Sequence, residues 1–488
     1  MPLYTLPTIS RLSLALSLLA VTSSTYAANT NSITPIRPAV DNQQLTACLD
    51  NLAQKGVFAS VKDIFARNRP TEVDSSVLEA LNYQPEFSKE PWDYLASLVD
   101  KERVVDGIAA SEHYADVLAK IEAHYGVSRY DVLGVWGVES DFGTTLGKKD
   151  VINSLATLSC FGRRQSYFRG EYVSALKILK QGDITKSDFK GSWAGAFGQT
   201  QFMPSTFLQL AQDFDGDNRR DLVNSQADAL ASTANFLKSS GYQSNQPWGY
   251  EVRLPSDTNF SNNRKNKKSV SHWKNIGITL PDGSALPDTL SSVGLFLPAG
   301  KQGPAFLVGR NFDAFYAYNA SENYALAIAH LSQRIEQKNT DVNFANAWPT
   351  DDLGLSRKES REVQESLNLL GYNIGEVDGI IGDKTRQTIQ KYQVDIGIKA
   401  DGKAGKKIYQ RLMASTSKLR EAAKVQAKIN AETKTAVNSN SQSTTQKPSD
   451  TKSSYGLSNL LENKTLLSIL ISLLIALSVA IFINRKRQ

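Results

Sequence analysis

The sequence has 488 residues, of which 41% are hydrophobic and 21% are charged, as in globular proteins with two or more domains. Its net charge is only +6, and no basic stripe with interleaved aromatic residues appears. Nucleic acid is therefore not a predicted partner.

The N-terminus is predicted to be a cleavable export signal, residues 1–27. Arg11 precedes the short apolar run "LSLALSLLAV" and a small-residue site that ends at Ala27. The apolar run is too short to span a bilayer.

Only two cysteines are present, Cys48 and Cys160. An exported chain with an even number of cysteines favours one disulfide. Two separately buried thiols remain the alternative, because neither cysteine has the spacing of a metal site.

Residues 41–245 have a mainly helical pattern. The segment 91–126 repeats apolar residues at helical spacing, and Gly126 is expected to end its last helix.

The stretch "GVWGVESDFG" (134–143) contains a carboxylate on an apolar helical face. Val132, Val135, Trp136 and Glu139 lie at i, i+3, i+4 and i+7. Burying Glu139 is costly unless it is paired or keeps its proton for catalysis. A solvated or ion-paired glutamate is the alternative, and Asp141 would point to another side of a helix.

The glycine-rich stretch "GSWAGAFGQTQFMPSTF" (191–207) predicts a loop, followed by a helix that begins at Pro204. Ser192, Gln201 and Phe202 combine uncharged hydrogen-bonding groups with an aromatic face, which suits a sugar polymer. The alternative is a tightly packed turn.

Residues 212–228 contain alternating aspartates. Asp213, Asp215 and Asp217 match positions 1, 3 and 5 of a calcium loop. Asn218 replaces the usual glycine, and Asp221 or Asp228 would have to supply the missing acidic ligand. A solvated acidic turn is the alternative to a metal site.

Residues 248–312 change to short β-prone runs, "YEVRLP", "IGITLPDG" and "GPAFLVG", which predict a small strand-rich lobe. A helical pattern returns at 322–335.

Residues 353–413 form a compact unit with three short amphipathic helices and glycine-rich turns. Residues 414–464 are poor in large apolar residues and predict a flexible linker with a root-mean-square span of roughly 40 Å. The uncharged run 465–484 is long enough to span a membrane, and the Arg485–Arg487 cluster after it is expected to stay in the cytoplasm.

Two hydrolase classes receive little support. The four histidines form no H-E-x-x-H motif, and no G-x-S-x-G motif is present. Zinc amidase and serine hydrolase chemistry are therefore not predicted.

Five ordered blocks together resemble the membrane-bound lytic murein transglycosylase B family, of glycoside hydrolase family 103 type. They are "GVWGVESDFG", "GRRQSYFRGEY", "GSWAGAFGQTQFMPSTF", "DFDGDNRRDL" and "YNASENYALAI". The resemblance covers residues 41–346. Residues 353–413 resemble the peptidoglycan-binding type 1 domain through "VDGIIGDKT". The main departure from the family is the predicted C-terminal anchor in place of an N-terminal lipid.

The resemblance implies a mainly α (α+β) fold with a lysozyme-like catalytic core, a helical lobe and a small β-containing lobe. It implies that Glu139 is the sole catalytic acid and that no organic cofactor is needed. The positions that match the family's substrate groove are Tyr94, Arg163, Arg164, Ser192, Gln201, Phe202, Tyr318 and Tyr324. Those that match its structural Ca²⁺ loop are Asp213, Asp215, Asp217, Asp228 and Arg219 through its backbone carbonyl.

The implied reaction cleaves peptidoglycan strands between N-acetylmuramic acid and N-acetylglucosamine. One glutamate, kept protonated by apolar surroundings, would act first as acid and then as base, giving a 1,6-anhydro end. A hydrolytic muramidase and a non-catalytic murein-binding tether are the alternatives. The expected location is the periplasmic face of the inner membrane in a Gram-negative-type bacterium. Cell-wall synthesis enzymes are a further class of partner, of which the sequence names no member.

Overall fold

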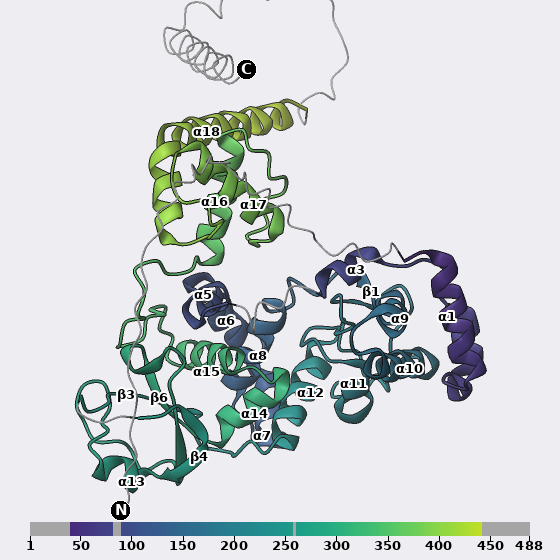
Figure 1. The fold of residues 1–488 in the computed structure, drawn as a ribbon, viewed down its shortest axis with the longest axis horizontal. Coiled ribbons are helices and arrows are strands. Elements are labelled where there is room, and N and C mark those ends of the chain that lie inside the picture. Colours follow the sequence, from purple (N-terminus) through teal and green to yellow (C-terminus); the bar gives the residue numbers. More distant parts are fainter. Residues whose placement is uncertain (1–39, 82–88, 257–259, 442–488) are drawn as a thin grey trace, which may run out of the picture. The chain divides into compact units, whose positions relative to one another are not determined.

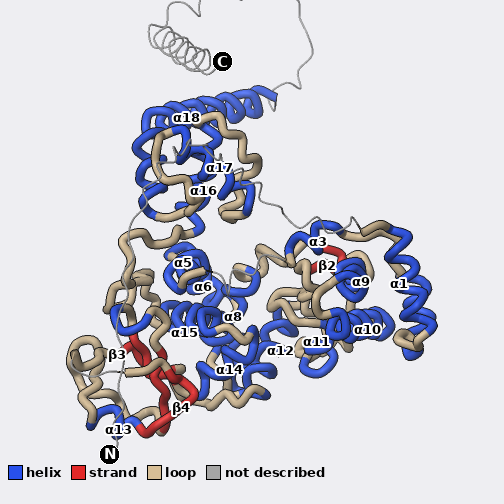
Figure 2. The backbone as a smooth tube through the Cα atoms, in the orientation of Figure 1, coloured by secondary structure: helices blue, strands red, loops and turns tan. Residues whose placement is uncertain are grey.

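The computed structural model describes residues 40–81, 89–256 and 260–441. These residues are mainly helical, with two small antiparallel sheets (Figures 1 and 2). The predicted signal peptide and the predicted spanning run 465–484 lie outside the described residues. Among the residues that are described, no helix is both long and apolar enough to cross a membrane.

One lobe is built from N-terminal helices packed on the middle of the chain. Its buried core joins residues of α1 (Asn42–Gln54), η1 (Ala59–Val61), α2 (Lys62–Asn68), α3 (Ser75–Ala80), α9 (Val151–Phe161), α10 (Gln165–Gln181) and α11 (Pro204–Leu210). Pro204 occupies the first turn of α11, as predicted, because a missing N–H costs nothing there.

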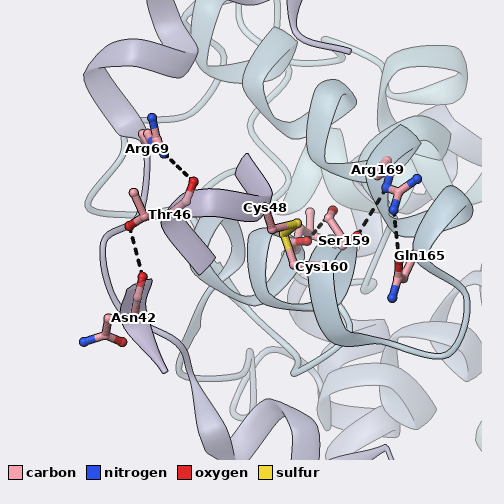
Figure 3. Close-up of a disulfide and its surroundings, with 9 residues drawn as sticks. Asn42, Thr46, Cys48, Arg69, Ser159, Cys160, Gln165 and Arg169 are labelled. Atoms are coloured by element: carbon pink, nitrogen blue, oxygen red, sulfur yellow. Dashed lines mark hydrogen bonds between the residues drawn. A yellow bond between two sulfur atoms is a disulfide. The ribbon is translucent and has the colours of Figure 1, made fainter. Parts of the chain in front are cut away.

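A disulfide between Cys48 of α1 and Cys160 of α9 crosses this lobe (Figure 3). It links positions 112 residues apart in the sequence. Arg69 strengthens the same region by donating to the Thr46 carbonyl and to Asp50. The N-terminal helix is therefore fixed to the core both covalently and by polar contacts.

The central core surrounds the helix that carries Glu139. It contains α5 (Pro91–Leu98), α6 (Lys101–His113), α7 (Ala115–Tyr125), α8 (Arg129–Ser140), α12 (Gln226–Ser239), α14 (Arg310–Asn319) and α15 (Glu322–Glu336). The helical pattern at 91–126 thus forms three helices, and Gly126 ends the last with a positive φ of 68°.

Helices α8 and α15 lie side by side and cross very closely (Figure 1). Gly134 makes this approach possible. A Cβ atom at this position would lie 2.2 Å from Ser332 Oγ and 3.0 Å from the backbone oxygen of Ile328.

A four-stranded antiparallel sheet of order β3-β6-β5-β4 forms the predicted β lobe. Its strands are β3 (Gly249–Val252), β4 (Asn263–Ser269), β5 (Ser292–Phe296) and β6 (Ala305–Val308); α13 (Val270–Asn275) and η2 (Gly300–Gln302) lie between them. The prediction of a strand in "IGITLPDG" is wrong, because that segment makes only an isolated bridge at Thr279. The polar strand β4 was missed because its apolar contacts are few. The second sheet pairs β1 (Lys149–Asp150) with β2 (Lys190–Gly191).

The C-terminal part of the described chain contains α16 (Arg357–Leu369), α17 (Asp383–Asp395) and α18 (Lys406–Ser441). The first two helices and the start of the third share a small core around Val363, Ile389 and Leu412. The prediction of a flexible linker from 414 is wrong over 414–441, which α18 occupies. The Ala, Lys, Glu and Gln residues there favour helix even without a core to bury.

Candidate active site

Glu139 lies in the last turn of α8, and the chain reverses directly after it. Asp141 is the C-cap with φ 53°, and its N–H donates to the Gly137 carbonyl at 3.1 Å, while the N–H of Phe142 donates to Trp136 at 3.4 Å. Phe142 also has a positive φ, of 55°. This Schellman-type end leaves Glu139 half-buried beside a strained turn.

Tyr324 is the direct partner of Glu139. Its side chain is 2% exposed, and its hydroxyl donates a hydrogen bond to Glu139 Oε1. Burial and the charge of Glu139 raise the pKa of Tyr324 well above its ordinary value, so the phenol keeps its proton. Helix α15 therefore supplies a fixed donor to the carboxyl group.

Tyr318 extends this cluster toward the glycine-rich loop. Its hydroxyl donates to the Thr200 carbonyl at 2.8 Å, and its ring lies 6.2 Å from that of Tyr324 and 6.0 Å from that of Phe202. Burial and Glu139 raise its pKa as well. Tyr94, also buried, is close enough to contribute to the raised pKa of Tyr324.

The loop after β2 packs directly against α8. The indole N–H of Trp136 donates to Gln199 Oε1 at 3.1 Å, and Ser140 Oγ donates to the Gln199 carbonyl. Gln201, at a positive φ of 53°, donates through Nε2 to the carbonyls of Leu146 and Gly198. These contacts show a packed turn against the helix that carries Glu139, and the role of this stretch in binding a sugar polymer stays a prediction.

The remaining predicted groove residues lie farther out. Ser192 is half-buried, and its hydroxyl accepts a hydrogen bond from the Ala196 N–H at 3.1 Å. Arg163 and Arg164 are exposed between α9 and α10, and Arg164 covers the ring of Tyr167 at 4.3 Å.

Glu139 and Asp141 line a cleft of about 600 Å³. The opposite wall comes from the C-terminal unit, through Asp378–Gly382, Arg386 and Lys403. Asp141 is not available as a second catalytic carboxylate, because Arg103 contacts its Oδ1 and Arg357 its Oδ2. Arg103 and Arg357 were not predicted; only their proximity in the fold identifies them.

The acidic loop after α11 has the geometry of a cation site. One carboxylate oxygen from each of Asp213, Asp215, Asp217 and Asp228 lies within 4.8 Å of the others. Asn218 occupies the glycine position with φ 67°, and its N–H donates to Asp213 Oδ2 at 2.9 Å. Asp228 and not Asp221 is the fourth acidic group, and its oxygens also accept hydrogen bonds from the N–H groups of Phe214, Asp215 and Asp221. Four hard oxygen donors on a wrapped loop fit Ca²⁺.

Comparisons with known proteins define the class to which this fold and cleft belong. A model of the transglycosylase SLT domain matches residues 41–333, and a model of a peptidoglycan binding domain matches residues 356–412. The chain therefore belongs to the transglycosylase SLT domain family.

Relatives support this assignment. The membrane-bound lytic murein transglycosylase B of Escherichia coli is 32% identical over 247 residues, which are 50% of this chain and 66% of that protein, slightly under two thirds of its length.

Solved structures agree. SltB3 from Pseudomonas aeruginosa, in complex with NAG-anhNAM-pentapeptide, is 42% identical and covers 76% of this chain and 98% of its own, with a TM-score of 0.58. Slt35 of E. coli, in complex with calcium, is 27% identical. The match covers 61% of this chain and 94% of the Slt35 chain, with a TM-score of 0.51.

Proposed function

We propose that this protein cleaves the β-1,4 bond between N-acetylmuramic acid and N-acetylglucosamine in peptidoglycan and leaves a 1,6-anhydro end. The observation that carries the proposal is one half-buried glutamate in a cleft, hydrogen-bonded by Tyr324, whose neighbouring carboxylate Asp141 is occupied by two arginines. The bound NAG-anhNAM-pentapeptide of the SltB3 relative agrees with an anhydro product.

In the proposed mechanism Glu139 acts twice. Tyr324 holds Oε1, so Oε2 carries the proton that passes to the glycosidic oxygen as the bond to C1 breaks. The resulting carboxylate then removes the proton from the C6 hydroxyl of the muramoyl residue. The C6 oxygen bonds to C1, which closes the anhydro ring and restores the acid.

The rival reaction is hydrolysis by the same fold, in which water would attack C1. Mass spectrometry of digested sacculi separates the two, because anhydro products are one water lighter than reducing ends. We expect anhydro ends from the wild-type chain and none from Glu139→Gln, which should still bind sacculi. Reducing ends as the main product would establish a muramidase instead.

A non-catalytic tether is the second rival. Clearance of a sacculus suspension by the wild-type chain, with no clearance by the Glu139→Gln control, supports the enzyme. Equal turbidity with both proteins would support the tether.

The location is part of the proposal. The signal-like residues 1–27 and the apolar run 465–484 support export and anchoring to the inner membrane, with the enzyme on the periplasmic side. Carbonate extraction of membranes tests the anchor: the full chain should stay in the pellet, whereas a chain ending at Ser441 should be released. Release of both would refute the anchor.

The acidic loop is proposed to hold a structural Ca²⁺. Asp213, Asp215, Asp217 and Asp228 would ligate it, and the calcium complex of Slt35 agrees with this assignment. The ion would cross-link the loop to the start of α12, where Asp228 lies.

A further inference from the structure

We propose that Arg357, in the first turn of the peptidoglycan-binding unit, is a positioning residue for Glu139. This inference rests on the proposed function. In this proposal the contact of the peptidoglycan-binding unit with the catalytic domain fixes the turn that ends α8. The peptidoglycan-binding unit then contributes to catalysis as well as to substrate binding.

Arg357 reaches three carboxylates of the catalytic domain. Its backbone N–H and its Nε each donate to Asp100 Oδ2 at 3.0 Å, and Nη2 contacts Asp100 Oδ1 at 3.2 Å and Asp106 at 3.3 Å. Nη1 contacts Asp141 Oδ2. One guanidinium group thus connects the N-cap of α6, which is Asp100, to the C-cap of α8, which is Asp141.

The network is largely shielded from water. The exposed fractions of the side chains are 15% for Arg357, 4% for Asp100 and 20% for Asp141. Hydrogen bonds from Arg357 lower the pKa of Asp100 despite its burial, so this carboxylate stays charged. Removal of the guanidinium would leave buried negative charges without their partner, which is costly.

Asp141 is the residue through which Arg357 can act on Glu139. It lies two positions after Glu139 and has a left-handed conformation, which is unfavourable for a residue with a side chain unless its surroundings hold it. Arg103 holds its Oδ1 at 3.1 Å from within the catalytic domain, and Arg357 holds Oδ2 from the second unit. Without Arg357 the turn keeps only one of these ionic contacts.

A second ion pair between the same units provides a control. Glu102 of α6 pairs with Arg361 of α16, and both side chains are more than a third exposed. Arg361 lines the cleft, but Glu102, the residue that is changed, is not among its lining residues. Glu102→Gln therefore weakens the contact between the units without affecting Asp141.

The test measures kcat and KM of full-length variants on a soluble glycan-strand fragment. We expect Arg357→Met to lower kcat about tenfold or more with a smaller change in KM, since the loss is in the geometry of Glu139. Arg357→Lys, which keeps the charge but not the fork, should recover part of kcat. Glu102→Gln should match the wild type.

An independent readout follows the turn itself. In folded Arg357→Met, confirmed by a cooperative thermal melt, the amide hydrogens of Asp141 and Phe142 should exchange faster than in the wild type. In a double-mutant cycle with Asp141→Asn, the loss of kcat from Arg357→Met should be much smaller than in the wild-type background.

Three results would overturn the proposal: unchanged kcat in Arg357→Met, a rise in KM alone, or equal losses in Arg357→Met and Glu102→Gln. An inactive wild-type chain would instead refute the proposed function. If Arg357→Met does not fold, Arg357→Lys decides: it must lower kcat more than Glu102→Gln does, and by less in the Asp141→Asn background, and equal rates for Arg357→Lys and the wild type would overturn the proposal.

Discussion

The hydroxyl of Tyr324 donates a hydrogen bond to Oε1 of Glu139, across 185 residues of sequence. The bond joins α15 to α8, two helices of the central core. It fixes Oε1 of Glu139 to a buried phenol, and in the proposed mechanism Oε2 is the oxygen that carries the proton.

We expect Tyr324→Phe to lower kcat by about tenfold to a hundredfold, because a hydrogen bond to a charged group contributes about 1.5–3 kcal/mol. The thermal melt should change little, since the ring remains. Tyr372→Phe is the matched control. The Tyr372 hydroxyl also donates to a carboxylate, Asp395, at 2.7 Å, and this pair lies away from the site. Equal rates for wild type and Tyr324→Phe would show that Glu139 does not need this donor.

We expect Ca²⁺ to raise the melting temperature of the wild-type chain relative to a sample in chelator. At a free concentration 100 times its Kd, a bound ion stabilises the folded state by about 2.7 kcal/mol. Asp217→Asn should remove most of this shift. Asp282→Asn is the control. Asp282 accepts a hydrogen bond from the Ser284 N–H, just as Asp217 accepts one from the Arg219 N–H. Identical melts with calcium and with chelator would exclude the metal site.

Asp131 should make the fold less stable as pH rises. Burial raises its pKa from 3.8 to about 6, while the Tyr242 hydroxyl donates to Oδ2 at 2.6 Å. Between pH 4 and 6 the folded state binds more protons than the unfolded chain, so this group's contribution to stability falls over that range, by about 3 kcal/mol in total.

Asp131→Asn should therefore be more stable relative to the wild type at pH 7 than at pH 4. Urea denaturation at both pH values measures the difference. A stability difference that does not vary with pH would show that folding does not raise the pKa of Asp131.

The double variant Cys48→Ser and Cys160→Ser should lose about 2–5 kcal/mol of stability, since it opens a loop of more than 100 residues. Thermal melts of the variant and of the wild type in reductant should agree. A wild-type melt that does not respond to reductant, with the thiols shown to be free, would contradict this prediction.

Local sequence patterns were sufficient for the elements with strong periodicity. The helix around Glu139, the start of α11 at Pro204 and the end of α7 at Gly126 depend on neighbouring residues, and each is where the pattern places it. The calcium-like turn was readable for the same reason, because its acidic residues are close in sequence.

Contacts between distant segments were not readable from composition or spacing. Arg357 lies more than 200 residues after Asp141, and nothing in its own segment "LSRKES" distinguishes it from a solvated arginine. The strand β4 was missed because its sequence "NRKNKKS" is polar, and its partners are distant in the sequence: β5, and Asp313 and Glu322, which pair with Arg264. For Tyr324, only the resemblance to a known family indicated a role.

Gly134 lies where α8 packs against α15, the two helices that carry Glu139 and Tyr324. Even a single methyl group at this position would collide with Ser332 and with the backbone of Ile328. The close packing of α8 on α15 therefore requires a residue without a Cβ atom. Alanine at this position would force the two helices apart and displace Glu139 from Tyr324, although neither of these side chains had been changed.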